Sequence, residues 1–321
     1  MSSSPNDVLK VGVAQIAPVW LDRAGTLEKV ASFVSEAGEA GCKLVAFGEA
    51  LVPGYPFWIE RTDGARFNNP VQKRMFAHYL DQGVVIGRGD LSEISCICAQ
   101  KGIAAYVGVM ERAPDRGGHS LYCSLVYIDG DGRLGSIHRK TQPTYEERLV
   151  WAAGDGHGLL AHDLGPFRVG GLNCYENWMP LMRSALYAQG VDLHVAVWPG
   201  GGHNTVDLTR FIAIESRSYV ISASGLLRPD DFESTNPQRE ELLRDAPDFF
   251  ANGGSAIAAP TGQWVVEPVL GEERLLIADL DHALIREERH NFDLAGHYSR
   301  PDITQLTVNR ARQTTAVFVA P

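Results

Sequence analysis

A glutamate, a lysine and a cysteine each stand directly after a segment with the length and pattern of a β-strand: Glu49, Lys140 and Cys174. α/β folds place their ligand sites at the ends of strands. Taken singly, each residue has an ordinary structural explanation, as a buried small side chain, a cap or ion-pair partner, or a solvated surface group. Their common position at strand ends makes them candidates for a single site.

Together, these three side chains could carry out covalent hydrolysis. A thiol is a weak nucleophile until it loses its proton, and its reference pKa is about 8.5. The Glu49 carboxylate can take that proton, because burial raises the pKa of a carboxyl group towards neutrality. The Lys140 ammonium can stabilise negative charge that develops on the substrate. Catalysis through Cys174 would then require neither a metal ion nor an organic cofactor.

Histidine is the usual alternative partner for a catalytic cysteine. The chain has ten histidines, but none lies in a segment that resembles the local signature of a Cys–His protease. His157, in the glycine-rich loop 154–158, is interpreted as a structural or supporting residue.

The composition excludes several classes of protein. The chain has 321 residues, of which 45% are hydrophobic and 21% charged, and this balance is typical of a globular protein. Its net charge of −10 argues against nucleic acid as a partner. No apolar run reaches the roughly 18 residues of a membrane span, and the first residues do not resemble a secretory signal. We therefore expect a cytoplasmic protein with neither a nucleic-acid nor a membrane partner.

The five cysteines do not form a disulfide framework, because their number is odd and they are spread through a long chain. Cys96 and Cys98 lie in a segment that predicts a helix. Two residues apart on a helix, they would point roughly 200° away from each other and could not share a metal ion. Both are interpreted as small hydrophobic residues.

Strands and helices alternate along the chain, which predicts a layered α/β architecture. The chain is expected to form a single domain over 1–321, with a core of about 8–307 and a short tail over 308–321. The segment 228–251 is polar without a clear period and predicts a surface insertion. The turn at 129–132 favours a hairpin over a calcium loop, because it lacks the acidic twelfth residue. Strands are predicted at 8–16, 43–47, 103–111, 121–128, 133–139, 167–173, 193–198, 219–224, 255–268 and 274–280. Helices are predicted at 26–39, 70–82, 89–101, 180–189, 206–217 and 282–292.

Three separated motifs resemble those of the carbon–nitrogen hydrolase superfamily, and within it the nitrilase branch. The first is Phe47-Gly48-Glu49-Ala50-Leu51-Val52-Pro53-Gly54-Tyr55-Pro56. The second is His138-Arg139-Lys140-Thr141-Gln142-Pro143-Thr144-Tyr145-Glu146-Glu147-Arg148-Leu149-Val150-Trp151, followed by the Gly154-Asp155-Gly156 loop. The third is Gly170-Gly171-Leu172-Asn173-Cys174-Tyr175-Glu176-Asn177-Trp178-Met179-Pro180-Leu181. The segment 296–302 also resembles the nitrilase pattern. The likeness extends from about residue 8 to 307.

The resemblance implies a four-layer αββα sandwich and a catalytic set of four residues. Carried over by motif, these are Cys174, Glu49, Lys140 and Glu147. Glu147 is chosen over Glu146 because the nitrilase motif places its carboxylate directly before an arginine. The sequence departs from the common pattern at Gly48, at Tyr175 beside the nucleophile, and in its short C-terminal tail, which argues against long helical filaments.

The resemblance also implies the activity: a nitrilase that hydrolyses an organic nitrile to the carboxylic acid and ammonia, through a thioimidate and an acyl-thioester on Cys174. An amidase or N-carbamoyl hydrolase, or a cyanide hydratase or dihydratase, would use the same residues. A catalytically silent oligomeric binding protein is a more remote alternative. The run 144–151 favours the nitrilase.

An apolar pocket is expected beside these residues, with ordinary core packing as the alternative for its aromatic members. Its predicted lining is Tyr55, Tyr175, Trp198 and Pro199. The expected partners are a small-molecule nitrile and further copies of the chain, in a homodimer or higher homo-oligomer, with no cofactor and no metal ion.

Overall fold

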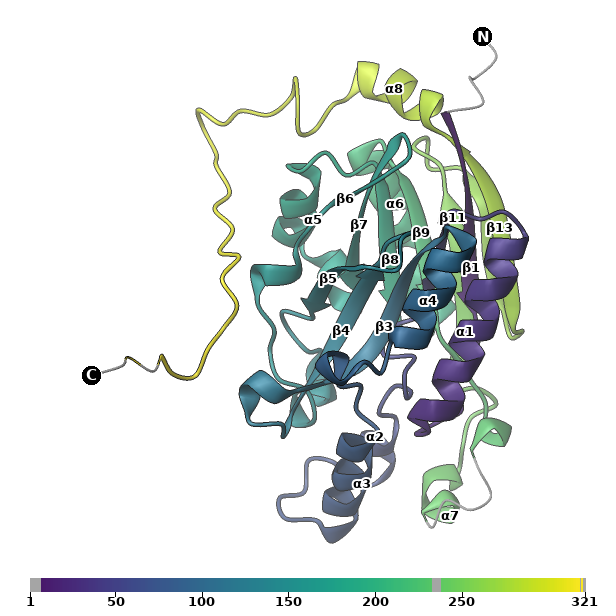
Figure 1. Cartoon of the computed structure of the whole chain (residues 1–321), viewed down its shortest axis with the longest axis vertical. Coiled ribbons are helices and arrows are strands. Elements are labelled where there is room, and N and C mark those ends of the chain that lie inside the picture. The colour runs from purple at the N-terminus through teal and green to yellow at the C-terminus, as the bar shows by residue number, and fades with distance from the viewer. Residues whose placement is uncertain (1–6, 233–237, 318, 320–321) are drawn as a thin grey trace.

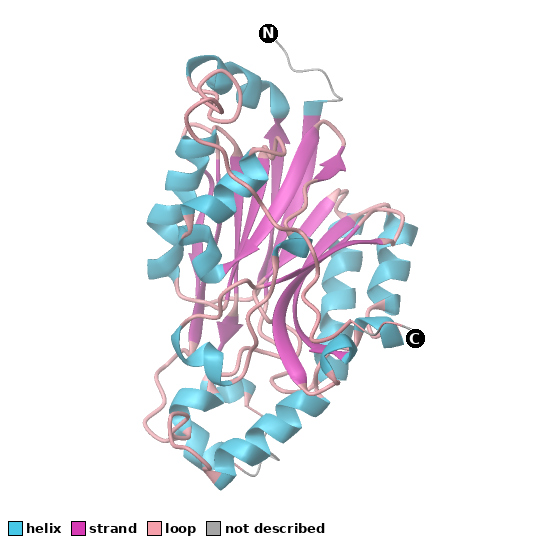
Figure 2. Ribbon diagram, turned by 90° about the vertical axis from the view of Figure 1, so that its left-hand side faces the viewer, coloured by secondary structure: helices cyan, strands magenta, loops and turns pink. Residues whose placement is uncertain are grey.

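Two β-sheets face each other and carry helices on both outer sides, in a computed structural model that describes residues 7–232, 238–317 and 319 (Figure 1). Figure 2 shows the strands as two central layers between the helices. This is the four-layer αββα sandwich that the resemblance implied.

The first sheet has the order β13 (Arg274–Asp281), β1 (Val8–Gln15), β2 (Leu44–Phe47), β3 (Ala104–Ala113), β4 (Ser120–Ile128), β5 (Leu134–Arg139). The second has the order β10 (Leu226–Leu227), β11 (Ala251–Ala258), β9 (Tyr219–Ser224), β8 (Leu193–Trp198), β7 (Phe167–Asn173), β6 (His162–Leu164), with β12 (Trp264–Leu270) paired to β11.

Each outer layer has its own apolar core. α1 (Arg23–Glu39) and α4 (Ser92–Lys101) pack on the first sheet, where Val30 and Ile94 join the same buried cluster as Val45. α5 (Pro180–Tyr187) and α6 (Gly202–Ser216) cover the second sheet. α2 (Trp58–Arg61), α3 (Pro70–Asp81) and α7 (Arg239–Leu243) gather at one end of the sandwich, and α8 (His282–Asn291) lies at the other (Figure 1).

The inner faces of the two sheets form a third core. It includes Leu44, Tyr106 and Leu125 from the first sheet and Val195 and Ile221 from the second. Strands covered on both faces have continuous apolar sequences, and every residue of β2, β8 and β9 is buried. β1, β2 and β3 run parallel, as do β7, β8 and β9. The carboxyl ends of the strands in each parallel set therefore lie at the same end of their sheet. The candidate residues follow strands at this end.

Most predicted elements are confirmed to within a few residues, but three interpretations are wrong. The strand predicted at 255–268 is a hairpin of β11 and β12, because a turn closes at Gly262. Cys96 is exposed on α4, while Cys98 is buried as expected. The segment 228–251 is more than a surface insertion: its described part buries Phe232 and Leu242 in an aromatic cluster over the site. Its residues 233–237 lie outside the described part of the chain.

The prediction of a hairpin is confirmed. β4 and β5 form the hairpin predicted at 129–132, where the Asp129 side chain accepts the backbone N–H groups of Asp131 and Arg133. All five cysteines are free thiols. Among the described residues, no helix is long and apolar enough to cross a membrane.

The C-terminal tail returns to the body of the molecule after α8. It runs along one side as an extended chain (Figure 1). Arg312 pairs with Asp155 at 2.9 Å, and the backbone N–H of Gln313 donates to the same carboxylate. The tail is thereby fastened to the loop 154–158, whose Gly154 N–H donates to the carbonyl of Lys140.

Gly108 on β3 allows a close backbone approach beside the candidate site. A Cβ there would lie 2.1 Å from the carbonyl oxygen of Gly48. We expect Gly108→Ala to lower the free energy of unfolding by about 1–3 kcal/mol, because the backbone before Glu49 must move. Urea denaturation measures this. Gly87→Ala is the control, since a Cβ at Gly87 meets no atom within 4 Å; an equal loss in both variants would contradict the prediction.

Candidate active site

The four residues carried over by motif lie together in the structure. The Lys140 ammonium nitrogen lies 2.9 Å from Oε1 of Glu49 and 2.7 Å from Oε2 of Glu147. The Cys174 sulfur lies within 4.8 Å of carboxylate oxygens of both glutamates. Lys140 and both glutamates are almost completely buried. The cluster therefore combines a thiol, two carboxylates and one ammonium away from bulk water.

Glu49 is held by a hydrogen bond between the two sheets. It follows β2, and its backbone N–H donates to the carbonyl of Trp198 at the end of β8, at 3.1 Å. The next residue, Ala50, adopts a left-handed backbone conformation with φ of 47°, which turns the chain away from the strand. The carboxylate lies against Lys140. Its Oε2 has no hydrogen-bond partner among the described residues, although the Cys123 thiol lowers the pKa of this carboxyl group.

Lys140 extends the end of β5. Its N–H donates to the carbonyl of Cys123 at 2.7 Å, and its carbonyl accepts from Gly154 at 2.8 Å. Burial alone lowers the pKa of this lysine, but the charges of Glu49, Cys174 and Glu147 outweigh it and raise the pKa well above its usual range. Lys140 is therefore protonated in the resting site, at the centre of the cluster.

Glu147 is directed inward by a short 3₁₀ helix, Tyr145–Leu149. Its carboxylate accepts from the backbone N–H of Thr144 at 2.6 Å and from Lys140. The hydroxyl of Tyr55 donates to its other oxygen at 2.8 Å. Glu146 is only partly buried. The structure thus brings Glu147, rather than Glu146, to the cluster.

Cys174 begins a second 3₁₀ helix, Cys174–Trp178, directly after β7. Its φ of 37° lies in the left-handed region, which costs a non-glycine residue about 1–3 kcal/mol. The Asn177 side chain compensates by donating to the carbonyls of Leu172 and Cys174, at 3.2 and 3.0 Å. The backbone N–H of Tyr175 also donates to the sulfur. The strained turn directs the thiol towards the carboxylates.

The pKa values of this site match a proton transfer from thiol to carboxylate. Burial raises the pKa of Glu49 to about 7; the charge of Glu147 also raises it, while Lys140 opposes both. Burial, together with the charge of Glu49, raises the pKa of Cys174 well above its usual range. The resting thiol is therefore protonated, and Glu49 is poised near neutrality to accept its proton during attack.

The Lys140 ammonium competes with any metal ion for this site. Glu49, Glu147 and Cys174 present ligand atoms close enough for one ion. However, Lys140 already contacts both carboxylates, so it occupies the position where a cation would be held. The donor set fits an internal ammonium better than a metal ion.

The four predicted pocket residues lie in different surroundings. Tyr55 and Pro199 line a small cavity of about 10 Å³ together with Glu49. Trp198 is buried in the core, where its indole N–H donates to Ser222 at 2.7 Å and its cluster packs behind Cys174. Tyr175 is 50% exposed at the start of the 3₁₀ helix. Their contact with a substrate stays a prediction.

Reasoning from the sequence missed two buried side chains that hold the nucleophile, Glu176 and Asn177. Both lie in the third motif, and neither was considered for a role. A signal was present: Asn173 and Glu176 have the spacing of a capping box, in which each side chain bonds the other's backbone N–H. Thr144 and Glu147 have the same spacing in the second motif.

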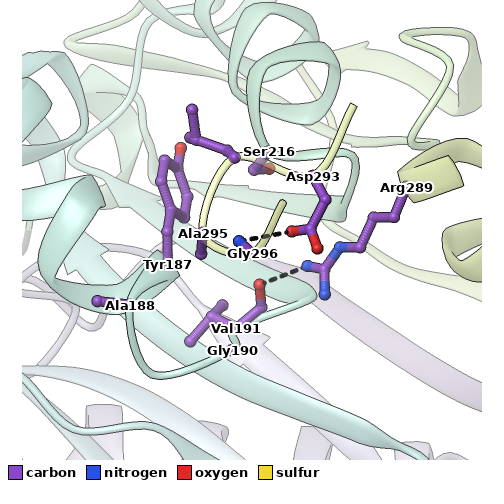
Figure 3. A pocket seen from close by; sticks show the side chains of 10 residues that line it. Tyr187, Ala188, Gly190, Val191, Ser216, Arg289, Asp293, Ala295 and Gly296 are labelled. Carbon is purple, nitrogen blue, oxygen red and sulfur yellow. Dashed lines mark hydrogen bonds between the residues drawn. The ribbon is translucent and has the colours of Figure 1, made fainter. Parts of the chain in front are cut away.

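A different cavity, of about 240 Å³, lies between the loop that precedes β8 and the segment that follows α8 (Figure 3). Its lining includes Tyr187, Arg289 and Asp293. The polar groups there already have partners: Arg289 donates to the carbonyl of Val191, and Asp293 accepts from Gly296. It precedes the start of β8, whereas Cys174 follows the end of the parallel strand β7. This cavity is therefore separate from the cluster.

Comparison with known proteins identifies the family and agrees with the fold. Residues 10–290 match the family described as carbon-nitrogen hydrolase, and the chain belongs to this family. It is 35% identical over 316 residues to "Nitrilase 2" of an unknown prokaryotic organism, with 96% of this chain and 95% of the relative covered. It is 34% identical to an "Aliphatic nitrilase" of Sinorhizobium fredii (strain HH103), covering 96% and 98%. It is 33% identical to an "Arylacetonitrilase" of Aspergillus niger, covering 95% and 90%.

Among solved structures, the chain resembles an amidase from Nesterenkonia sp. The TM-score is 0.64 at 18% identity, over 91% of this chain and 97% of the amidase. A mutant of that amidase is described as carrying acrylamide added at its active-site cysteine. At this identity, the likeness shows the shared fold.

The raised pKa of Glu49 predicts a pH-dependent stability. Between its ordinary value of 4.5 and about 7, the folded protein keeps a proton that the unfolded chain has released. The free energy of unfolding should therefore fall by about 3 kcal/mol as pH rises through this window. Glu49→Gln removes the titration, so the wild type should lose stability relative to the variant over the same window, as measured by denaturation at several pH values. Glu146→Gln is the control, and indistinguishable profiles for wild type and Glu49→Gln would refute the assignment.

Proposed function

We propose that this protein is a nitrilase that converts an organic nitrile to the carboxylic acid and ammonia. The observation that carries the proposal is the buried contact of Lys140 with Glu49 and Glu147, with the Cys174 sulfur within 4.8 Å of both carboxylates. This arrangement supplies a nucleophile, a base and an acid without a bound cofactor. The nitrilase names of relatives at 30–35% identity support the choice of substrate.

The first half of the proposed reaction forms a thioimidate. Glu49 accepts the thiol proton while the Cys174 sulfur adds to the nitrile carbon, and one π bond of the C≡N group breaks. The nitrogen takes a proton from Lys140, which the proton gained by Glu49 can restore. Because the pKa of Glu49 is about 7 and that of the thiol is much higher, the proton transfer accompanies the attack rather than preceding it.

The second half releases the two products. Water adds to the thioimidate carbon, with Glu49 as base, and the C–N bond breaks to give ammonia and a thioester on Cys174. A second water cleaves the thioester to the carboxylic acid and restores the thiol. Glu147 keeps the ammonium of Lys140 in place through its 2.7 Å contact, and Tyr55 holds Glu147. We assign both a positioning role.

The central test is substitution of the nucleophile. We expect Cys174→Ala to abolish ammonia release from nitriles, because no other group could form the thioimidate. The panel should include phenylacetonitrile, an aliphatic nitrile, cyanide and a simple amide, with ammonia, amide and acid all measured. Circular dichroism should show an intact fold.

Cys96→Ala is the matched control, because this exposed thiol lies on α4 and should leave turnover unchanged. Turnover retained in Cys174→Ala would overturn the assignment of the nucleophile. If the wild type turns over the amide but no nitrile, the protein is an amidase. If it turns over cyanide alone, it is a cyanide hydratase or dihydratase.

We further propose that the protein forms a homodimer through α5 and α6. These helices cover the second sheet and are joined by the pair Arg183–Glu215. Their outer surface exposes Leu181, Phe211 and Ile214 by 63%, 52% and 41%. Large apolar side chains gathered on one exposed helical face are typical of a protein interface.

Light scattering tests this interface. The variant with Leu181→Glu and Phe211→Glu should have about half the mass of the wild type, because two charges would be buried at the contact. Leu134→Glu, at an exposed apolar position on β5, should keep the wild-type mass. A wild type that runs as a monomer, or an unchanged mass in the double variant, would contradict the proposed interface.

A further inference from the structure

We infer that Glu176 is a positioning residue that joins the two sheets and sets the Cys174 thiol against the Lys140 ammonium. The inference rests on the proposed function for its turnover measurement. Glu176 lies two residues after Cys174 and its side chain is completely buried. It does not belong to the cluster of Lys140, Glu49, Glu147 and Cys174, so the proposed chemistry does not account for it.

The carboxylate of Glu176 accepts four hydrogen bonds. Oε1 accepts from the backbone N–H of Thr141 at 2.8 Å and from its hydroxyl at 2.6 Å. Oε2 accepts from the backbone N–H of Asn173 at 3.0 Å and is bonded to Nε2 of His138 at 2.9 Å. Both oxygens are therefore saturated within the protein, and the group has no capacity left for a substrate.

The donors come from both sheets. His138 lies on β5 of the first sheet, and Thr141 lies just beyond the end of that strand, directly after Lys140. Asn173 ends β7 in the second sheet and directly precedes Cys174. One carboxylate thus bonds the residue after the ammonium and the residue before the nucleophile. In the described part of the chain no hydrogen bond joins Lys140 directly to Cys174, so this bridge links the segments that carry them.

The surroundings of Glu176 stabilise its negative charge. Burial alone would raise its pKa, but His138 and the hydrogen bonds from Thr141 outweigh burial and lower the pKa to about 2. The group is therefore a carboxylate at every pH at which the protein would work. An ionised acceptor makes stronger hydrogen bonds than a neutral one, which makes the bridge stiff.

Glu176→Gln tests the bridge. The amide keeps one acceptor oxygen and replaces the other by an NH₂ group, which donates and cannot accept. Whichever way the amide is turned, it therefore loses the bonds either from Thr141 or from Asn173. We expect kcat for nitrile hydrolysis to fall about 10- to 100-fold with little change in KM, because a displacement on the order of 1 Å can cost that much in rate. Alkylation of Cys174 by iodoacetamide, followed by mass spectrometry, should become slower and shift its pH profile.

Asp192→Asn is the matched control. Asp192 is also a buried carboxylate, and it accepts from the backbone N–H of Arg168 at 2.7 Å and from His282 at 2.9 Å. It lies before β8, at the edge opposite Cys174. This variant should lose stability in the same way as Glu176→Gln, while kcat and the alkylation profile of Cys174 stay as in the wild type.

Thr141→Val keeps the test decisive if Glu176→Gln does not fold. It removes only the hydroxyl bond to Glu176 and should reduce kcat about three- to tenfold. Wild-type kcat and an unshifted alkylation profile in a folded variant would overturn the inference. Because alkylation requires no substrate, a shifted profile in a protein that hydrolyses no nitrile would sustain the bridge and reject only the proposed function.

Discussion

The ammonium of Lys140, buried between two carboxylates, is the interaction on which the site depends. A buried charge is costly unless it is paired and hydrogen-bonded, so Lys140 requires Glu49 and Glu147 as much as they require it. This pairing also connects separate elements of the fold. It ties the end of β2 to the end of β5 and to the 3₁₀ helix of Glu147. Burial, together with the charge of Glu147, keeps the pKa of Glu49 near neutrality against the opposing charge of Lys140, so the same carboxylate can accept a proton.

The second constraint is the meeting of two sheets. Glu49 and Lys140 follow strands of the first sheet, whereas Cys174 follows a strand of the second. Each sheet is rigid because apolar layers cover both its faces. The relative position of base and nucleophile therefore depends on a few polar bonds that cross the gap, including the bond from Glu49 N–H to Trp198 and those of Glu176.

Much of this arrangement could be predicted from the sequence, because it depends on local patterns. Apolar runs marked the buried strands, and the positions of Glu49, Lys140 and Cys174 after those runs placed them at one edge. What could not be predicted depends on contacts between distant segments. The burial of Phe232 required knowledge of the aromatic cluster it joins, and the exposure of Cys96 depended on the rotation of α4 against its sheet. Tyr55 was expected in a pocket wall, and the bond from its hydroxyl to Glu147, 92 residues away, could not be foreseen.

The division of the cluster between two layers makes the thickness of the sandwich a chemical variable. The side chains between the layers, among them Tyr106 and Leu125, act as spacers that determine how far the sulfur stands from the ammonium. Hydrostatic pressure, which favours states with less internal void volume, would thus act on the spacing of the reacting groups as well as on the stability of the fold. Substitution during evolution would have the same effect. Replacing one side chain between the sheets by a slightly larger or smaller one would change the turnover rate without changing any reacting group.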